Sequence, residues 1–436
     1  MAKIAYIGAG SVNFAPNLIG DVLTNRALTG SHLALMDVNA DNLDVSLRYA
    51  KKLAAQVGSY IKLEATTDLS RALEGADYVF ETTLKQGEAR VREERTCQKH
   101  GLYLYSGCTT GPAGVFRALR EIPATLDILR VMEKVCPKAY YLHYANPTNT
   151  VSLALSKASP IKSVGLCHSV EGTAKTMAHY LGAPFKDVAH WAAGVNHQAW
   201  ILRFERDGED LYPQFRALYN DKKIYEKDKV RFEIMDYFGY FPTESSPHNS
   251  EYVPYFRRTL AMAREWASQT AHTLNQYGGI DQEGSLKTRA AKREVLLKSI
   301  ESVEPVVLRD HDEYCIRVIA AMMTGEAFCF NGNVPNNGLI TNLPPDLCVE
   351  VPILADRTGL HPCFVGRLPD QCAALNASRC AGDLLAVKGA LEGDKKAIEQ
   401  AVALDPLTAA VLTLDQIKKL VADLFEADKE YLPQFE

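Results

Sequence analysis

The stretch KIAYIGAGS, residues 3 to 11, decides the fold of this chain. Its first five residues are mostly apolar or aromatic and predict a short buried strand that Gly8 closes. Gly8 permits a tight turn, and Gly10 lets the backbone approach a bound pyrophosphate closely. A helix that starts near Ala15 would point its positive N-terminal end at that phosphate. The stretch therefore predicts the first strand, turn and helix of a nucleotide-binding sheet.

The residues around this turn favour NAD as the nucleotide. A second strand, predicted over residues 32–38, carries Asp37 near its end, where a carboxylate can accept hydrogen bonds from an adenosine ribose. The third glycine of G-x-G-x-x-G would fall at position 13, where this chain has Asn13. A G-x-G alone also occurs in turns that bind nothing, so the prediction depends on strand, helix and Asp37 together. The predicted cofactor-binding residues are Gly8, Gly10, Ser11, Asn13 and Asp37.

Strand and helix patterns alternate through the first half of the chain. Between residues 41 and 57, apolar side chains recur at helical spacing, and Gly58 is a plausible stop. Further apolar strands are predicted at residues 78–83, 139–146 and 163–169. A repeated β-α-β pattern with apolar strands indicates a parallel sheet covered on both faces. We therefore expect an α/β fold with a Rossmann-like parallel sheet in its N-terminal part.

The second half is less regular, and we expect a domain boundary near residue 200. Residues 1–200 would form the NAD-binding domain, and residues 201–436 an α+β domain for substrate binding, catalysis and oligomerisation. Three features of the second half are a charged stretch expected to be mobile, a turn-rich segment and a return of helical patterns, at residues 281–294, 330–346 and 383–423 respectively.

Composition excludes several classes of partner. The net charge of -5 and the pI near 6.2 give no general attraction for nucleic acid or an anionic membrane. No apolar stretch approaches the roughly 20 residues that span a bilayer, and the N-terminus lacks the pattern of a signal peptide. The ten cysteines form no CxxC pair, which is typical of free thiols in a reducing compartment. We expect a cytoplasmic protein that binds small molecules.

Polar residues follow several predicted strands at the end where open α/β sheets bind ligands. Cys167 and His168 follow one strand, and His197 ends the motif GVNH after another. Thiolate and neutral imidazole are good ligands for a divalent metal, although a buried Cys beside a His also occurs as simple packing. Asn146 and Asn149, in YANPTN, carry amides that suit hydrogen bonding to a sugar or carboxylate.

Six motifs together resemble glycoside hydrolase family 4, the NAD- and metal-dependent glycosidases. The resemblance covers most of the chain, and the CHSV variant is similar to the α-galactosidase subgroup. In order along the chain the motifs are GAGS, TTGPAG with RALREIP, NPTN, GLCHSV, GVNH and TESSPHNSEYVPYF.

The resemblance implies a redox route to hydrolysis of an α-glycoside, most simply an α-galactoside. NAD+ takes a hydride from C3 of the sugar, which makes the C2 proton acidic, and Mn2+ or another divalent metal held by Cys167 and His197 polarises the new ketone. Tyr252 matches the family's C2 base and needs a nearby cation to lower its pKa. His168 is assigned to substrate contact or to departure of the leaving group, and the alternative role is to orient Cys167. The resemblance also implies a homodimer or homotetramer.

Two positions depart from the family pattern. Cys108 stands where members commonly have aspartate, and Ala113 replaces a usual glycine. If that aspartate serves acid–base chemistry or fixes the nicotinamide, its loss affects the substrate or the activity. His248 in SSPHNSEY is interpreted by default as an ordinary loop histidine, and a role like that of His168 is the alternative.

Three other functions stay open. A dehydrogenase of the lactate and malate type shares the nucleotide fold, but needs a His-Asp pair and an arginine rather than a metal. A non-catalytic NAD-sensing module would explain GAGS and leave the metal ligands without a use. Within the family, an α-linked uronide or another modified hexoside is the rival to galactose.

Overall fold

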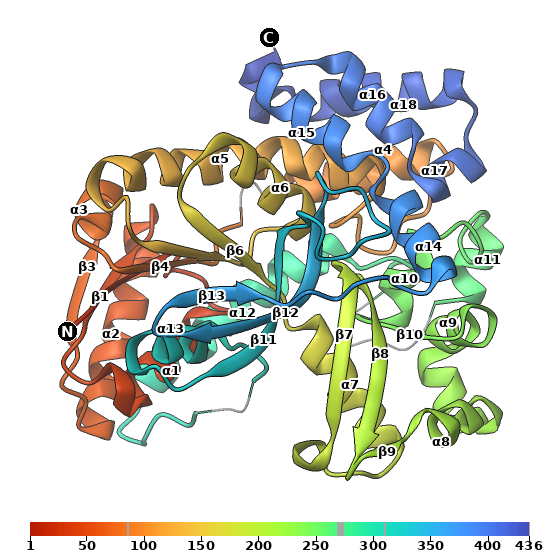
Figure 1. The fold of residues 1–436 in the computed structure, drawn as a ribbon. Coiled ribbons are helices and arrows are strands. Elements are labelled where there is room, and N and C mark those ends of the chain that lie inside the picture. Colours follow the sequence, from red (N-terminus) through yellow and green to blue (C-terminus); the bar gives the residue numbers. More distant parts are fainter. Residues whose placement is uncertain (85–86, 268–273, 309–310, 436) are drawn as a thin grey trace.

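One mixed sheet organises the molecule in the computed structural model, which describes residues 1–84, 87–267, 274–308 and 311–435. The strand order along the sheet is β10-β8-β7-β12-β11-β6-β5-β4-β1-β2-β3 (Figure 1). The sheet crosses the boundary predicted at residue 200, because β11 pairs with β6. Parallel pairing holds from β6 to β3, and antiparallel pairing from β11 to β10.

The parallel half confirms the predicted α/β fold with its Rossmann-like sheet. Its order, 3-2-1-4-5-6, is that of dinucleotide-binding sheets. Each predicted strand is present, and several end a few residues before the predicted limit. The strands are β1 Lys3–Ile7, β2 His32–Met36, β3 Lys62–Thr66, β4 Tyr78–Glu81, β5 Tyr140–His143 and β6 Lys162–Leu166.

Helices cover both faces of this half, as Figure 1 shows. Successive residues of β1 point to opposite faces, so Ile4 and Tyr6 join one core cluster while Ala5 and Ile7 join the other. The predicted helix after the second strand ends at Gly58, which adopts a left-handed φ of 63°. The helices over the two faces include α1 Ala15–Thr24, α2 Ala40–Val57 and α13 Cys315–Thr324 on one side, and α3 Leu69–Leu73, α5 Gly111–Val135 and α6 Thr148–Ala158 on the other.

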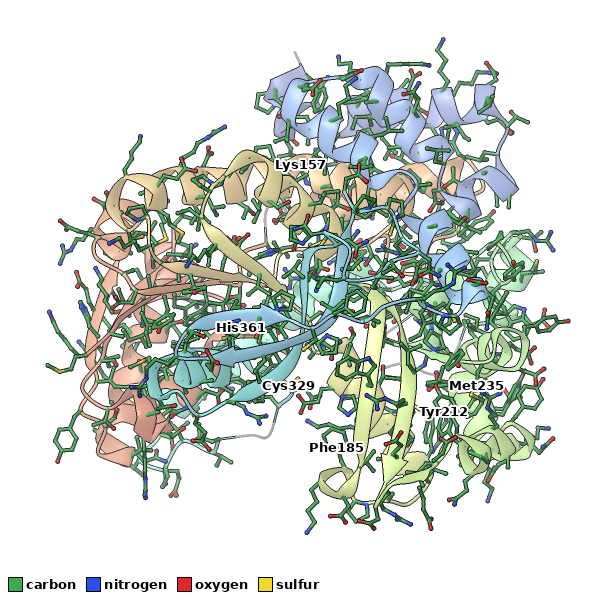
Figure 2. All side chains as sticks on the ribbon, viewed as in Figure 1. Lys157, Phe185, Tyr212, Met235, Cys329 and His361 are labelled. Atoms are coloured by element: carbon green, nitrogen blue, oxygen red, sulfur yellow. The ribbon has the colours of Figure 1, made fainter. Side chains whose placement is uncertain are left out.

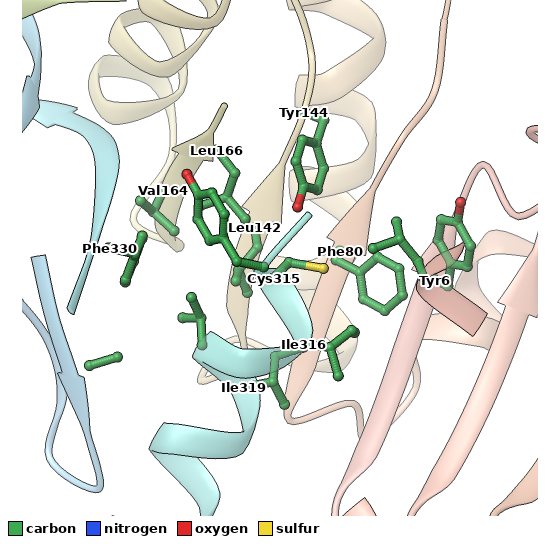
Figure 3. Close-up of a cluster of buried hydrophobic side chains, with 14 of the residues drawn as sticks. Tyr6, Phe80, Leu142, Tyr144, Val164, Leu166, Cys315, Ile316, Ile319 and Phe330 are labelled. Atoms are coloured by element: carbon green, nitrogen blue, oxygen red, sulfur yellow. The ribbon is translucent and has the colours of Figure 1, made fainter. Parts of the chain in front are cut away.

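One core cluster joins α13 to the strands of the parallel half (Figure 3). The rings of Tyr6 and Phe80 stack with centroids 4.3 Å apart. Cys315 and Ile316 on α13 are buried within the same cluster. A helix from the second half of the chain therefore closes the core of the first.

The antiparallel half continues the sheet. β11 is bonded to β6 at Gly332 and Asn333, and β12 is bonded to β7 through Glu350 and Gly194. Tyr212 and Met235, both labelled in Figure 2, belong to the apolar cluster that packs on β8. The strands are β7 Ala189–Val195, β8 Gln198–Arg206, β9 Glu209–Asp210, β10 Phe241–Pro242, β11 Phe328–Pro335, β12 Cys348–Asp356 and β13 Gly359–Pro362.

The structure refines two predictions for the second half. The charged stretch 281–294 lies in α12, Gln282–Glu301, because Asp281 caps the helix and the stretch is rich in strong helix formers. The turn-rich segment 330–346 begins inside β11, because pairing to both β6 and β12 outweighs the weak strand propensity of Asn331 and Gly332.

The helices predicted over residues 383–423 are confirmed. They are α15 Asp383–Glu392, α16 Lys395–Ala403, α17 Pro406–Val411 and α18 Leu414–Asp428. The other helices are α4 Ala89–Lys99, α7 Ser169–Tyr180, α8 Tyr212–Ala217, α9 Lys222–Phe238, α10 Ser246–Tyr252, α11 Leu260–Glu265 and α14 Asp370–Cys380. Among the residues described, no helix has the length and apolar content needed to cross a membrane.

Candidate active site

The glycine turn after β1 is closely packed. Gly8 has a φ of 83°, and a Cβ placed on Gly10 would lie 2.7 Å from Asp37 Oδ2. The Gly10 N–H donates to that same oxygen at 2.8 Å. Asp37 therefore supports the turn from the end of β2, and the bare backbone at both glycines fits the close approach of a pyrophosphate.

Helix α12 lies across this turn. Ser11 Oγ accepts a hydrogen bond from the Phe14 N–H at 3.3 Å, and Asn13 Oδ1 accepts one from Lys292 Nζ at 2.8 Å. Arg293 Nε donates to Asn42 Oδ1 at 3.0 Å. Asn13, at the position of the third glycine, thus anchors a helix from the second half of the chain over the predicted nucleotide turn.

His197 and Tyr252 lie in contact within a group of buried polar side chains, here called the polar cluster. His197 follows β7, and its Nδ1 lies 2.9 Å from Thr109 Oγ1 and 3.3 Å from the Tyr252 hydroxyl. Burial lowers the pKa of His197 to about 3, so its imidazole is neutral, as a metal ligand requires. Because Nδ1 faces the two hydroxyls, Nε2 is the nitrogen left to hold a metal.

Cys167 follows β6, and its backbone N–H and carbonyl both bond the Tyr314 hydroxyl, at 3.3 and 3.0 Å. Burial raises the pKa of its thiol to about 12, and the thiol contacts the Asn196 side chain. Asn196 also donates to Glu350 Oε1 at 3.3 Å.

Asn196 Oδ1 and Glu350 Oε2 are buried without a hydrogen-bond partner among the described residues. A thiol and a neutral imidazole beside such orphaned oxygens fit a transition-metal site. The described part of the chain has no group of three or more His, Cys, Asp or Glu arranged to hold a metal, so a metal here would need substrate or water oxygens as further ligands.

Tyr252 ends α10 and is fully buried. Burial raises the pKa of its hydroxyl well above 10, so ionisation needs a cation. The guanidinium of Arg379 lies 5.6 Å from the centre of its ring. The structure thus brings two of the predicted residues, Tyr252 and His197, into direct contact.

His168 is half-exposed, and its Nδ1 lies 3.1 Å from Glu313 Oε1. This hydrogen bond raises the pKa of His168 to about 9, so the imidazole is protonated at neutral pH. Its contact is with Glu313 rather than with Cys167, which favours a proton donor over a residue that orients the thiol.

The two amide side chains predicted to bind substrate make different contacts. Asn146 Oδ1 accepts a hydrogen bond from Thr148 at 3.1 Å. Asn149 is fully buried on α6, and its amide donates to Asp383 on α15. Asn149 therefore ties α6 to the C-terminal helices.

Several residues of the polar cluster were not predicted from the sequence. Thr109 and Glu244 lie inside the motifs TTGPAG and TESSPHNSEY, so their polar side chains were a usable signal. Glu313, Glu350 and Arg379 lie in segments that carry no motif, and only the fold brings them to the polar cluster.

The fold and the polar cluster define an α/β enzyme with a dinucleotide-type turn and a group of buried polar side chains that follows β6 and β7. The chain belongs to family 4 of the glycosyl hydrolases, because the family model matches residues 3–183 and the model of the family's C-terminal domain matches residues 192–408. The predicted resemblance to a glycoside hydrolase is confirmed.

Full-length relatives point the same way. The chain is 38% identical over 443 residues to an alpha-galactosidase of Bacillus subtilis, covering 100% of both chains. It is 27% identical over 465 residues to an alpha-galacturonidase of Lachnoclostridium phytofermentans, covering 99% of this chain and 97% of the relative. Among solved structures, a 6-phospho-alpha-glucosidase from gut microorganisms, in complex with NAD and Mn2+, has a TM-score of 0.85 at 19% identity and covers 100% of both chains.

Proposed function

We propose that this protein hydrolyses α-galactosides in an NAD-dependent and metal-dependent reaction. The observation that carries the proposal is the contact between Tyr252 and His197, which sets a C2 base against a metal-ligand imidazole. The full-length similarity to an alpha-galactosidase supports galactose as the sugar. A dehydrogenase of the lactate and malate type is disfavoured, because the relatives that span the chain are glycosidases.

The chain's own residues would divide the work between two places. Gly8, Gly10 and Asp37 would hold the dinucleotide, and Cys167 with His197 Nε2 would hold the metal. When bound, NAD and Mn2+ would supply reversible hydride transfer at C3 and polarisation of the resulting carbonyl. Thr109 contacts His197 at Nδ1, which would leave the opposite nitrogen, Nε2, to hold the metal.

Proton transfers would belong to two side chains. Tyr252 would take the C2 proton, and the positive charges of the metal and of Arg379 would favour its ionised form. His168, held protonated by Glu313, would assist departure of the leaving group.

We also propose a division of labour near residue 200, with NAD bound by residues 1–200 and catalysis shared with residues 201–436. Assembly as a homodimer or homotetramer and a cytoplasmic location complete the proposal. The ten free thiols suit a reducing compartment.

A panel of chromogenic α-glycosides with NAD+ and Mn2+ tests the function. We expect the α-galactoside to be cleaved fastest, only in the presence of NAD+, and without accumulation of NADH, because the hydride returns to the sugar. A faster rate on the α-galacturonide would replace galactose by a uronide, the alternative supported by the alpha-galacturonidase relative. NADH formed in step with substrate loss would favour a dehydrogenase.

Removal of the metal tests the ligands. A chelator should abolish activity and Mn2+ should restore it, because a site with two protein ligands releases its metal readily. Cys167→Ser and His197→Ala should each lose Mn2+ affinity and rate together. Full activity in a preparation shown to contain no metal would contradict the assignment.

A further inference from the structure

A lysine from the second half of the chain lies at the predicted nucleotide turn. Lys292 is on α12, and its Nζ donates a hydrogen bond to Asn13 Oδ1 at 2.8 Å. Asn13 stands two residues before α1 begins, at the position of the third glycine of G-x-G-x-x-G. The ammonium group therefore lies beside the N-terminus of the helix that faces a bound pyrophosphate in this type of fold.

The partner of Lys292 does not neutralise its charge. An amide oxygen carries no net charge, and no carboxylate forms an ion pair with Lys292 in the described part of the chain. Lys287 on the same helix differs, because its Nζ lies 3.7 Å from Glu283 Oε1. The positive charge of Lys292 is therefore available to an anion.

The end of α1 favours the same kind of ligand. Its first turn holds no acidic residue, and no side chain caps its N-terminus. The N-terminal end of a helix is partially positive, and uncapped N–H groups there bind phosphate readily. Asp37 also faces the turn, but its two carboxylate oxygens accept the backbone N–H groups of Gly10 and Asn39, each at 2.8 Å. Helix end and lysine thus both attract negative charge to the turn.

Polar contacts other than that of Lys292 hold α12 across the turn. Lys52 of α2 donates to two backbone carbonyls at the C-terminal end of α12, at 2.8 and 2.6 Å. Arg293 Nε donates to Asn42 Oδ1 at 3.0 Å, and a Cβ placed on Gly10 would lie 2.8 Å from the Asn42 Cβ. The backbone of α12 therefore stays at the turn whichever partner Lys292 takes.

The side chain of Lys292 is suited to a second partner. A lysine ammonium ends a flexible four-carbon stem and has three N–H donors. One donor can bond a phosphate oxygen while another keeps Asn13, and α12 need not move for this to happen.

We propose that Lys292 is a further binding residue for NAD and pairs with its pyrophosphate. The inference rests on the proposed function, which assigns the dinucleotide to the turn at Gly8 and Gly10. The charge of Lys292 adds to the N–H groups of the turn and to the end of α1, and it offsets the negative charge of the two phosphates. The second half of the chain then completes the dinucleotide site, beyond the division near residue 200.

Calorimetric titration of NAD+ into the full-length, metal-free protein tests the contact without turnover. Lys292→Met should weaken NAD+ binding by roughly three- to tenfold, because one partly exposed charge-assisted hydrogen bond is lost. Lys292→Arg should keep most of the affinity, because it keeps a positive donor at the same place. ADP, which shares adenosine and two linked phosphates with NAD+, should lose affinity to a similar extent in Lys292→Met.

Lys287→Met is the matched control. It removes the same charge from the same helix, at a position about 140° around the helix axis from Lys292. Its affinity for NAD+ should stay within about twofold of that of the wild-type protein, because its charge is exposed and screened. Added KCl should weaken NAD+ binding more steeply in the wild-type protein than in Lys292→Met, whereas a merely structural role of Lys292 would leave the two salt dependences equal.

Several results would overturn the inference. Equal NAD+ affinity of the wild-type protein and Lys292→Met would overturn it, and a loss in Gly10→Val alone would then leave the proposed nucleotide turn standing. Equal losses in Lys292→Met and Lys287→Met would trace the effect to the overall charge of α12. A loss for NAD+ without one for ADP would place the contact on the nicotinamide riboside and not on the pyrophosphate. A wild-type protein that binds no NAD+ would overturn both the inference and the proposed cofactor.

Discussion

The two halves of the sheet build their sites in different ways. In the parallel half, the predicted nucleotide turn lies between residues 8 and 37, and its packing is made by backbone and two glycines. Around His197, which follows β7 of the antiparallel half, the residues come from separate elements of both halves, and Thr109, Tyr252 and Arg379 meet only in the folded chain. The glycine turn leaves room for a bound nucleotide, whereas the polar cluster holds buried polar side chains next to one another.

This difference predicts that a substitution in the glycine turn weakens NAD+ binding, whereas a substitution in the polar cluster slows the chemical step. Tyr252→Phe should produce the largest effect. We expect kcat to fall by about 10²- to 10⁴-fold, because a proton-transfer group is lost. The apparent affinity for NAD+ should stay nearly unchanged, because the variant removes an interaction proposed for the transition state and not one for cofactor binding.

Deuterium from D2O supplies the decisive measurement for this variant. Wild-type product should carry deuterium at C2, and the variant should lose label and turnover together. Product without C2 deuterium from an active wild-type enzyme would contradict the role of Tyr252 as base.

Gly10→Val changes the glycine turn in the parallel half of the sheet. Its Cβ would lie 2.7 Å from Asp37 Oδ2, so the turn must shift, at a cost of about 1–3 kcal/mol of stability. We expect KM for NAD+ to rise by at least about tenfold. Gly172→Ala is the matched control, because it lies on α7 with nothing within 4 Å of the added Cβ, and it should leave both quantities nearly unchanged. Equal loss in both variants would remove the special role of the turn.

Buried titratable groups should give the smallest effects, measured as the stability of the metal-free protein. Burial raises the pKa of Glu350 to about 7, so the folded state holds a proton that the unfolded state releases above pH 4.5. The free energy of unfolding contributed by Glu350 therefore falls as pH rises from 4.5 to about 7. Glu350→Gln should gain roughly 1–3 kcal/mol relative to wild type across this window, measured by urea denaturation of metal-free protein.

His143 on β5 provides the opposite case in the parallel half. Burial lowers its pKa to about 3, so the unfolded state binds a proton below pH 6.5 that the folded state does not. The stability of wild type should therefore fall as pH drops from 6.5 toward 3, and His143→Gln should lose this dependence. If the stability of each variant changed with pH in parallel with that of the wild-type protein, burial would not control the pKa of Glu350 and His143.

The sequence predicted the parallel half well because its signals are local. Strand β1, Gly8 and the helix over residues 41–57 are each decided by neighbours within a few residues. The helix over residues 282–301 was not predicted, because the charge of residues 281–294 was taken as a sign of mobility and the capping role of Asp281 was not recognised. Glu350 and Arg379 could not be predicted, because their contacts join segments more than 100 residues apart.

The insertion of β11 and β12 between β6 and β7 sets the order in which the enzyme can be assembled during synthesis. Cys167 and His197 are close in sequence, yet the strands that carry them are separated in the sheet by a hairpin made from residues 328–356. Until that hairpin leaves the ribosome, β6 has an open edge toward β7, and open edges are prone to pairing with other chains. A nascent chain that ends before residue 328 would hold both proposed metal ligands without the two strands that connect β6 to β7 in the sheet.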